Sequence, residues 1–312
     1  MKKQLLELLI CPLCLPREFP LTADIMVESH GDIETGTLGC PSCRSSFPIT
    51  DGIANLDPMH RPAAVAANRY ETETLVASYL WSHFSELTAD EHSSRAYSTW
   101  AGLIEPHSGI ALDVGGAVGR FAFEMSGRSD LAIGLDNSVA FTRAARNLMK
   151  KRQLSVAIKD EGLSGKLFSL ELPDHFISER VEFIVANALA LPFRGDAIGS
   201  FSSLNLADKV PSPMQHLREM NRVTRRQKAQ FLLSDPFSWS EEVAPVSEWL
   251  GGQEAGPFSG RGIDNISRLL QDPEGVLQPA WQVSEPDSVW WKIRTHTNHY
   301  ELIRSCFVHA RR

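Results

Sequence analysis

Residues 110–119 read Ile-Ala-Leu-Asp-Val-Gly-Gly-Ala-Val-Gly, and this stretch decides the fold that we expect. An apolar run ends at Asp113, and Gly115, Gly116 and Gly119 then open a helix. Glycines let the backbone turn sharply and approach a ligand closely. The free N–H groups of a helix N-terminus suit a carboxylate or a pyrophosphate. The stretch therefore predicts a strand, a turn and a helix that together bind a cofactor.

From this stretch onward, strand-like and helix-like patterns alternate through residues 106–312, as is typical of a parallel α/β sheet. The last two strand patterns predict an antiparallel pair that closes the sheet. The domain at residues 106–312 is therefore predicted to be a Rossmann-like seven-stranded α/β sheet. Strands are expected at 110–114, 131–135, 181–186, 198–205, 229–234, 289–294 and 300–309, and helices at 117–127, 138–152 and 212–224.

Two later segments complete the predicted cofactor site. The segment Ile133-Gly-Leu-Asp136-Asn137-Ser138 places an acid at the end of the second strand, where a carboxylate can accept both ribose hydroxyls. After the third strand the chain reads Asn187-Ala188-x-x-Leu-Pro-Phe193. The predicted cofactor-binding residues are Asp113, Gly115, Gly116, Gly119, Asp136, Asn137, Asn187, Ala188 and Asn205.

These segments, in this order, resemble the cofactor motifs of class I S-adenosylmethionine-dependent methyltransferases. Asp113 through Gly119 resembles the motif D-x-G-x-x-x-G, and residues 187–193 resemble D-A-x-x-L-P-F, whose side chain and backbone bind adenine in that family. Asn187 replaces the usual Asp, which changes the balance of donors and acceptors. Ala117 stands where a glycine is frequent, and alanine fits there if its φ is negative. The resemblance implies S-adenosylmethionine as the cofactor.

The N-terminal segment contains two pairs of cysteines, Cys11-Pro-Leu-Cys14 and Cys40-Pro-Ser-Cys43. In a chain with no recognisable secretion signal, paired C-x-x-C motifs indicate a metal. Four thiolates match the tetrahedral geometry that zinc prefers, and they leave no open position for water. We therefore expect a structural zinc bound by all four cysteines.

This segment resembles the Trm112-like zinc ribbons, through Leu5 to Pro12 and Cys40 to Ile53, although the insert between its cysteine pairs is longer. Relatives of this ribbon also occur fused or bound to RNA-modifying methyltransferases. The predicted organisation is a ribbon at 1–57, a helical linker and cap at 58–105, and the methyltransferase domain at 106–312. The linker begins with the proline-containing stretch 57–62.

Composition and charge restrict the class of substrate. The chain has 312 residues, 43% hydrophobic and 22% charged, with a net charge of −7. Residues 1–57 hold four Lys and Arg against eight Asp and Glu, a net of −4. Nucleic-acid binding requires a basic surface, so we expect no nucleic-acid partner. The short apolar run at Leu5–Ile10 is interrupted by a charge, and no stretch is long enough for a membrane span. We therefore expect a cytoplasmic protein with no membrane partner, and the sequence does not indicate its oligomeric state.

Two stretches indicate the methyl acceptor. Residues 70–84 read Tyr-Glu-Thr-Glu-Thr-Leu-Val-Ala-Ser-Tyr-Leu-Trp-Ser-His-Phe, with the spacing of an amphipathic helix. Residues 234–252 begin Ser-Asp-Pro-Phe-Ser-Trp-Ser-Glu-Glu. Both resemble the methyltransferase domain of ovothiol synthases, the 4-mercaptohistidine N-methyltransferase family. That resemblance covers most of residues 65–275 and implies methylation of a thiolated histidine on a ring nitrogen.

The chemistry of these residue types suits such a substrate. Carboxylates can hold a cationic amine or accept a ring N–H, and indoles can stack on an imidazole or on a sulfonium. Methyl transfer needs positioning and at most one base. The candidates for orientation or base duty are Tyr79, His83 and Asp208. The candidate substrate-binding residues are Tyr70, Glu71, Asp235, Trp239, Glu241, Glu242 and Trp249.

The sequence therefore predicts a methyltransferase that acts on a small histidine-derived thiol or selenol. One alternative is an RNA base methyltransferase whose ribbon binds RNA. A second is a non-catalytic, methyltransferase-like protein that binds a partner through its ribbon. The intact Asp113, Asp136 and glycines argue against the non-catalytic alternative, and the acidic charge argues against RNA.

Overall fold

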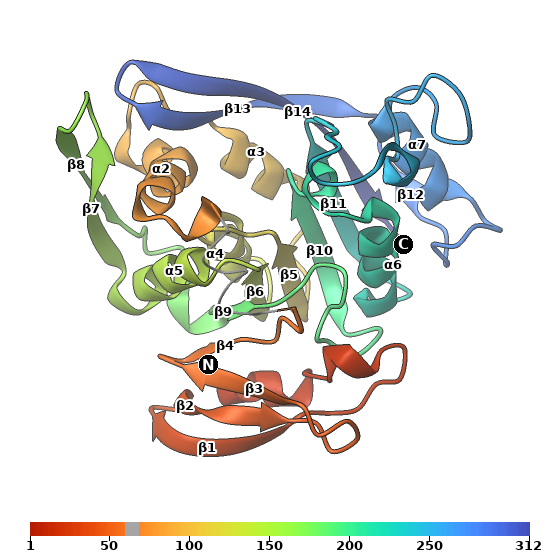
Figure 1. The fold of residues 1–312 in the computed structure, drawn as a ribbon, viewed down its shortest axis with the longest axis horizontal. Coiled ribbons are helices and arrows are strands. Elements are labelled where there is room, and N and C mark those ends of the chain that lie inside the picture. Colours follow the sequence, from red (N-terminus) through yellow and green to blue (C-terminus); the bar gives the residue numbers. More distant parts are fainter. Residues whose placement is uncertain (60–68) are drawn as a thin grey trace.

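The computed structural model describes residues 1–59 and 69–312, and the part of the predicted linker at 60–68 lies outside this range. An eight-stranded sheet forms the centre of the molecule (Figure 1). Along the sheet the strands follow the order β12, β14, β11, β10, β5, β6 and β9, while β13 pairs with β14. The strands are β5 (Ile110–Val114), β6 (Leu131–Asp136), β9 (Val181–Val185), β10 (Ile198–Leu204), β11 (Gln230–Asp235), β12 (Gln282–Val283), β13 (Asp287–His296) and β14 (His299–Arg311).

Five neighbouring strands, from β9 to β11, run parallel, whereas β14 is antiparallel to β11. Every residue of β9 and β10 is buried, as expected for parallel strands covered on both faces. The mixed α/β methyltransferase sheet is thus confirmed, with β12 as a short additional strand. Strand order reverses between β5 and β10, so the carboxyl ends of these strands border the crevice where α/β proteins bind ligands.

The three predicted helices of the methyltransferase domain are present, and they differ from the prediction only at their ends. The predicted helix at 117–127 begins only at residue 120, because Ala117 and Gly119 adopt positive φ angles and belong to the preceding turn. The sequence pattern did not predict α7 or the hairpin of β7 and β8. The predicted helices correspond to α4 (Arg120–Ser126), α5 (Val139–Lys151) and α6 (Pro213–Val223). The elements that were not predicted are α7 (Gly262–Gln271), β7 (Gln153–Lys159) and β8 (Gly165–Glu171).

A roof of helices and strands covers the carboxyl ends of the parallel strands. It consists of α2 (Glu73–Phe84), α3 (Ala96–Leu103) and the long β13–β14 hairpin, which crosses above both helices (Figure 1). The backbone N–H of Arg294 in β13 donates to Ser82 Oγ of α2 at 3.2 Å. Large apolar side chains of α2 and α3 join α4, α5 and β13 in one core, separate from the core that α6 and α7 share with the ribbon. The roof therefore closes the space above the sheet.

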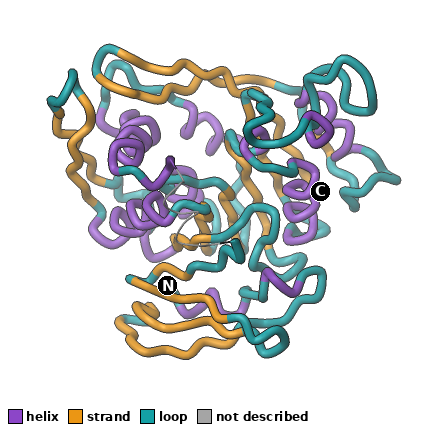
Figure 2. Tube along the Cα trace, viewed as in Figure 1, coloured by secondary structure: helices purple, strands orange, loops and turns teal. Residues whose placement is uncertain are grey.

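The N-terminal ribbon is an antiparallel sheet of β1 (Thr22–Ser29), β2 (Asp32–Gly39), β3 (Ser46–Thr50) and β4 (Ile53–Ala54). It lies at the opposite edge of the molecule from the roof (Figure 2). Just after β4, Asn55 forms a parallel bridge with Val185, and the N–H of Leu56 donates to the carbonyl of Val185 at 2.7 Å. The end of the ribbon therefore continues the central sheet beyond its outer strand β9.

Candidate active site and zinc centre

A cavity of about 730 Å³ lies between the roof and the carboxyl ends of the strands. Its volume is in the range of ligand pockets in proteins. One end is lined by predicted cofactor-binding residues, namely Gly115, Asp136, Asn137, Asn187, Ala188 and Asn205. The other end is lined mainly by aromatic residues: Tyr79, His83, Tyr97 and Trp291 of the roof, with Tyr70 from just before α2 and Phe141 of α5.

The turn after β5 is held by backbone hydrogen bonds and by glycine geometry. The N–H groups of Gly115 and Gly116 both donate to the carbonyl of Leu135, at 2.8 and 3.0 Å. Gly119 has φ +87°, and a Cβ there would lie 2.5 Å from the Phe183 ring. A glycine is therefore required at this position for conformation and for packing.

Ala117 departs from the sequence-based expectation, because its φ is +45° and not negative. Its N–H donates to Asp136 Oδ2 at 2.9 Å, which holds the residue in this left-handed conformation. The alanine therefore stores local backbone strain at the cofactor end of the cavity.

Asp136, the predicted ribose acceptor, lines the cavity. Its other oxygen accepts the N–H of Ser138 at 2.9 Å. A carboxylate offers about four lone-pair sites, so roughly two stay available to a ligand. Burial raises the pKa of Asp136 to about 6, while the backbone N–H donors oppose that rise. The residue is thus ionised at neutral pH and protonated in mild acid.

Asp113 is fully buried and does not line the cavity. Its Oδ1 accepts the hydroxyl of Ser202 in the neighbouring strand at 2.9 Å. Burial raises its pKa to about 7, and the nearby charge of Asp136 adds to this effect. Gly116 and Gly119 likewise lie outside the cavity lining. These three residues shape the turn, and Gly115 and Asp136 carry its contact with the cavity.

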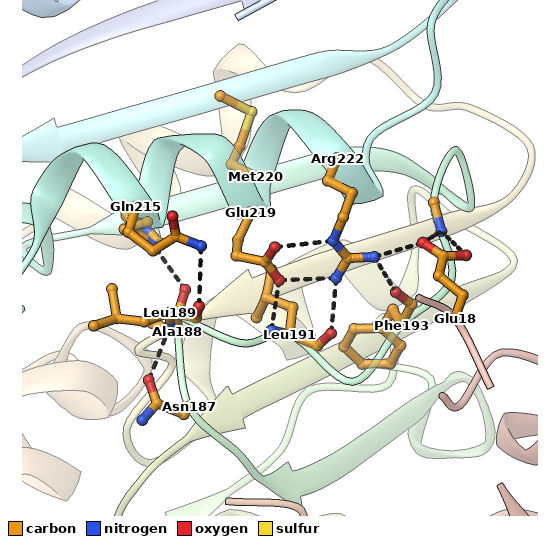
Figure 3. A network of polar contacts seen from close by, with 12 residues as sticks. Glu18, Asn187, Ala188, Leu189, Leu191, Phe193, Gln215, Glu219, Met220 and Arg222 are labelled. Atoms are coloured by element: carbon orange, nitrogen blue, oxygen red, sulfur yellow. Dashed lines mark hydrogen bonds and ion pairs between the residues drawn. The ribbon is translucent and has the colours of Figure 1, made fainter. Parts of the chain in front are cut away.

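Asn187 begins the loop that follows β9. Its Oδ1 accepts the N–H of Leu189 at 2.9 Å (Figure 3). Because the amide oxygen is engaged in this turn, the NH2 group is the part of the side chain that offers donors to a ligand. An adenine ring presents an acceptor at N1, which suits such a donor. Ala188 is held by its carbonyl, which lies 3.3 Å from Nδ1 of His216 in α6.

The ribbon contacts this same loop through its backbone. The N–H of Ile10 donates to the carbonyl of Pro192 at 3.0 Å, and the N–H of Arg194 donates to the carbonyl of Leu8 at 3.0 Å. These two hydrogen bonds form an antiparallel bridge immediately before the first cysteine, Cys11. The loop at 187–194, which the sequence predicts to bind adenine and which we call the adenine loop, is therefore attached to the segment that enters the zinc centre.

A network of side chains braces the loop from its other side (Figure 3). Arg222 of α6 pairs with Glu18 of the ribbon at 2.9 Å and with Glu219 at 2.8 Å. It also donates to the carbonyls of Leu191 and Phe193, at 2.8 and 2.7 Å. Glu219 in turn accepts the N–H of Leu191 at 2.7 Å. One arginine thus links the ribbon, α6 and the adenine loop.

The aromatic end of the cavity brings together Tyr70, a predicted substrate-binding residue, with Tyr79 and His83, the candidates for orientation or base duty. The Tyr79 ring lies 6.1 Å from the ring of Tyr70 and 5.5 Å from the ring of His83, measured between centroids. Sequence reasoning missed Tyr97 and Trp291, which complete this end. The alternation of Val289, Trp291 and Ile293 along β13 was the available signal, because it places Trp291 on the inner face of that strand.

His83 is buried and hydrogen-bonded. Its Nε2 lies 2.9 Å from the hydroxyl of Tyr97. Burial, with a smaller contribution from the Arg120 charge, lowers the pKa of His83 to about 3. The imidazole is therefore neutral at physiological pH.

Asp208 and Asp235 form a buried carboxylate pair beneath the cavity and do not line it. Asp208 Oδ2 accepts the Lys209 ammonium at 3.0 Å and the N–H of Ser238 at 2.7 Å. Asp235 accepts the N–H groups of Phe237 and Asp208, at 2.7 and 3.3 Å. Burial, with the neighbouring charge of Asp208, raises the pKa of Asp235 well above its usual range. The pair therefore positions Lys209 and Ser238, which do line the cavity.

Glu71 also lies outside the cavity lining, although the sequence suggested substrate contact. Its carboxylate accepts the N–H groups of Val139 and Ala140, at 2.8 and 3.0 Å. These are the first residues of α5, so Glu71 caps a helix N-terminus, where the dipole favours a negative charge.

Of the segment after β11, Pro236 and Ser238 line the cavity, but the predicted substrate-binding residues Trp239, Glu241, Glu242 and Trp249 do not. Trp239 and Trp249 stack on each other with ring centroids 6.3 Å apart. Trp249 Nε1 donates to the carbonyl of Ala244 at 2.9 Å, and Glu241 and Glu242 are exposed. The physical reason is that this segment folds back on itself and towards α7, where Gly262 contacts Phe237.

The four N-terminal cysteines converge on one point, and all four Sγ atoms lie within 4.8 Å of one another. The Cys11–Cys43 and Cys14–Cys40 sulfur separations are 3.6 and 3.7 Å. Tetrahedral zinc with bonds of about 2.3 Å requires sulfur separations of about 3.8 Å, so the cluster fits this metal. Hydrogen bonds from Ser45 lower the pKa of Cys43 to about 6, which favours the thiolate that zinc binds.

Comparison with protein families agrees with this geometry. Residues 112–229 match the family model described as a methyltransferase domain. Residues 2–52 match the family model of Trm112p-like proteins. No curated protein matches the sequence.

Several solved structures are similar to this chain at low identity. A Haloferax volcanii complex of the Trm112 methyltransferase activator with a methyltransferase matches at 14% identity, TM-score 0.43, over 80% of this chain and 95% of the other. A structure described by the conversion of a disulfide bond into a thioacetal group during echinomycin biosynthesis matches at 19% identity, TM-score 0.44, over 70% and 81%. A Methanosarcina mazei S-adenosylmethionine-dependent methyltransferase matches at 15% identity, TM-score 0.42, over 67% and 94%.

The family match over residues 112–229, the strand order and the cofactor motifs together indicate an S-adenosylmethionine-dependent methyltransferase domain in this chain. Its N-terminal module is a Trm112-like domain with a cysteine cluster that fits a structural zinc. No helix in residues 1–59 or 69–312 has the length and apolar character needed to cross a bilayer.

Proposed function

We propose that this methyltransferase transfers a methyl group to a ring nitrogen of a small histidine-derived thiol or selenol. The observation that carries the proposal is the single cavity that joins the cofactor motifs to a compartment lined by Tyr70, Tyr79, His83, Tyr97 and Trp291. A compartment walled by aromatic rings suits a planar imidazole, which stacks on them or meets their edges. S-adenosylmethionine, when bound, supplies the electrophilic methyl group. The protein's task is then to hold the acceptor ring in line with that methyl.

Within this proposal, residues 1–57 form the ribbon, 58–105 include the cap and 106–312 form the catalytic domain. Gly115, Asp136, Asn187 and Asn205 bind the cofactor, and Tyr70, Tyr79 and His83 contact the acceptor. The ribbon's role is to brace the adenine loop through Leu8, Ile10 and Glu18.

The RNA alternative is disfavoured because several basic residues form ion pairs with carboxylates of the ribbon. Lys150 pairs with Glu34 of the ribbon at 2.8 Å, and Arg146 pairs with Asp32 at 2.8 Å. Arg222 is engaged by Glu18. Because these cations neutralise ribbon acids, they do not form a basic surface for phosphates. The non-catalytic alternative is disfavoured by Asp136, whose lone pairs stay available to a cofactor.

The test is product mass spectrometry with a labelled methyl donor, run in parallel on 4-mercaptohistidine, its selenium analogue, histidine and total RNA. We expect label in the mercaptohistidine or selenohistidine product and none in RNA. Label in RNA, with none in the histidine derivatives, would establish the RNA alternative. No labelled product from any substrate, in a protein that binds S-adenosylhomocysteine, would favour the scaffold.

A further inference from the structure

Two unpartnered polar atoms distinguish the aromatic end of the cavity. In the part of the chain that the structure describes, several buried side-chain nitrogens and oxygens have no hydrogen-bond partner. Two of these atoms belong to residues that line the cavity: Nδ1 of His83 and Nε1 of Trp291. Both side chains are 4% exposed. A buried polar atom without a partner costs free energy and calls for an explanation such as a ligand.

The hydrogen bond between His83 and Tyr97 determines what Nδ1 offers. If Tyr97 donates to Nε2, the proton of the neutral imidazole lies on Nδ1, and one donor is left unsatisfied. If Nε2–H donates instead, both the Tyr97 hydroxyl proton and the Nδ1 lone pair are left unsatisfied. The first arrangement leaves fewer buried polar groups without partners, so it is favoured. His83 then presents an N–H donor and not a base.

Trp291 adds a second donor, because an indole nitrogen donates and never accepts. Its ring meets the His83 ring edge-on, with centroids 5.8 Å apart and planes at 73°. Tyr79 contacts both rings, with centroid distances of 5.5 Å to His83 and 6.2 Å to Trp291. Two residues with unpartnered buried nitrogens thus stand among the aromatic walls at this corner of the cavity.

We propose that His83 and Trp291 form a donor pair that holds the sulfur or selenium of the acceptor as its anion, which rests on the function proposed above. A chalcogenolate attached to an imidazole spreads its charge over the ring, so its burial among aromatic groups costs less than that of a carboxylate. Hydrogen bonds to an anion are the strong ones, so two donors favour the ionised form.

The donor pair removes the need for a base in the transfer step. The pyridine-like ring nitrogen of the anionic acceptor uses its lone pair to form the new N–CH3 bond. The S–CH3 bond of the sulfonium breaks, and its electron pair stays on sulfur to give S-adenosylhomocysteine. The acceptor's negative charge and the sulfonium's positive charge cancel, so the products form without proton transfer. His83 and Trp291 act by positioning the chalcogen, which orients the nitrogen towards the methyl group.

The test measures binding to the S-adenosylhomocysteine complex by calorimetry, with 4-mercaptoimidazole and imidazole as probes. We expect the wild type to prefer mercaptoimidazole, and Trp291→Phe and His83→Phe each to reduce that preference about tenfold, as for the loss of one hydrogen bond to a charged group. Trp290→Phe is the matched control, because Trp290 is 54% exposed on the neighbouring position of β13. It should leave the preference unchanged. Retained S-adenosylhomocysteine affinity shows that each variant is folded.

A second measurement reads the tautomer without any acceptor. Nitrogen chemical shifts of labelled histidine should show a proton on Nδ1 of His83, and Tyr97→Phe should change that pattern. An unchanged preference in Trp291→Phe and His83→Phe, or a proton on Nε2, overturns the donor pair even if mercaptohistidine is methylated. If the variants lose the preference while mercaptohistidine is not methylated, the donor pair stands and the proposed function fails. A wild type that binds neither probe, or binds both equally, overturns the donor pair.

Discussion

The end of the cavity that we propose for the cofactor is built from backbone turns, one carboxylate and asparagine side chains. The aromatic end, which we propose for the acceptor and call the acceptor end, is built from rings. The first depends on the turn at 115–119 and on the adenine loop, which the ribbon braces from outside. The second depends largely on rings contributed by α2, α3 and β13, and β13 lies far from the two helices in the sequence. The difference teaches that damage to the ribbon or the turns should weaken cofactor binding, whereas changes to single rings should weaken acceptor binding.

Loss of zinc should have the largest effect, and it should fall on the cofactor end. We expect one zinc per chain by elemental analysis, bound by Cys11, Cys14, Cys40 and Cys43. Structural zinc contributes about 10 kcal/mol or more to the folding of small domains. Chelation or Cys40→Ser should therefore unfold the ribbon and release the two backbone hydrogen bonds to the adenine loop. Those bonds are worth about 1–3 kcal/mol together, so, besides the loss of the ribbon fold, S-adenosylhomocysteine affinity should fall about fivefold or more.

Cys306→Ser is the control for that prediction, since Cys306 lies in β14 outside the cluster. It should leave both the zinc content and the affinity unchanged. Less than half an equivalent of zinc, with four titratable thiols in the N-terminal segment, would contradict the assignment of the metal site.

Asp136→Ala should have the next largest effect, again at the cofactor end. Removing the ribose acceptor should weaken S-adenosylmethionine binding by about 1.5–3 kcal/mol, as for a hydrogen bond to a charged group. Asp174→Ala, at an exposed position, provides the matched control. Calorimetry that finds the same affinity for Asp136→Ala and wild type would place the ribose elsewhere.

Ala117→Gly should sharpen the comparison, because it relieves strain at the cofactor end without removing a contact. The left-handed conformation at φ +45° costs an alanine about 1 kcal/mol or more, and a glycine adopts it freely. Thermal or denaturant unfolding should show a gain of up to about 1 kcal/mol. Ala122→Gly inside α4 should instead lose about 1 kcal/mol. A loss of stability in Ala117→Gly would show that the turn is not strained.

Lowering the pH should weaken the binding of the cofactor. Asp136 accepts hydroxyl protons best as the anion, and burial raises its pKa to about 6. Protonation therefore increases as the pH falls through 6, and affinity falls with it. Between about pH 7.5 and 5.5 we expect roughly a fourfold loss of S-adenosylhomocysteine affinity, measured by calorimetry. In Asp136→Ala this dependence should be flatter, and an equally steep profile there would assign it to another group.

Trp239→Ala and Glu242→Gln should have the smallest effect. The sequence suggested that both contact the acceptor, but neither lines the cavity. We expect kcat/KM for the acceptor to change by no more than about twofold, as for exposed substitutions away from a site. Tyr79→Ala, which removes a ring of the acceptor end, should cause a far larger loss. An equal loss in Trp239→Ala would show that the segment after β11 closes over the bound substrate.

The cofactor end could be predicted from sequence because each of its parts is a short contiguous motif. Asp136 follows a buried strand, and Asn187 opens a loop with a recognisable pattern, so spacing alone indicates their shared location. The acceptor end could not be assembled in this way. Tyr97 and Trp291 lie in elements almost 200 residues apart, and only the crossing of β13 over α3 brings them together. Conversely, the clustered Trp239, Glu241 and Glu242 were predicted to bind the substrate, but Trp239 stacks on Trp249 and the two glutamates are exposed. Adjacency in sequence does not fix which way a loop turns.

The position of the ribbon at the edge strand β9 has a consequence for stoichiometry. Because the ribbon and the sheet belong to one polypeptide, docking is intramolecular, and its effective concentration is on the order of millimolar. A few backbone hydrogen bonds at Val185, Pro192 and Arg194 then suffice to keep the ribbon docked at any protein concentration. Each catalytic domain therefore has one ribbon docked on its adenine loop, and dilution does not remove it. A ribbon on a separate subunit would dissociate at concentrations below its Kd.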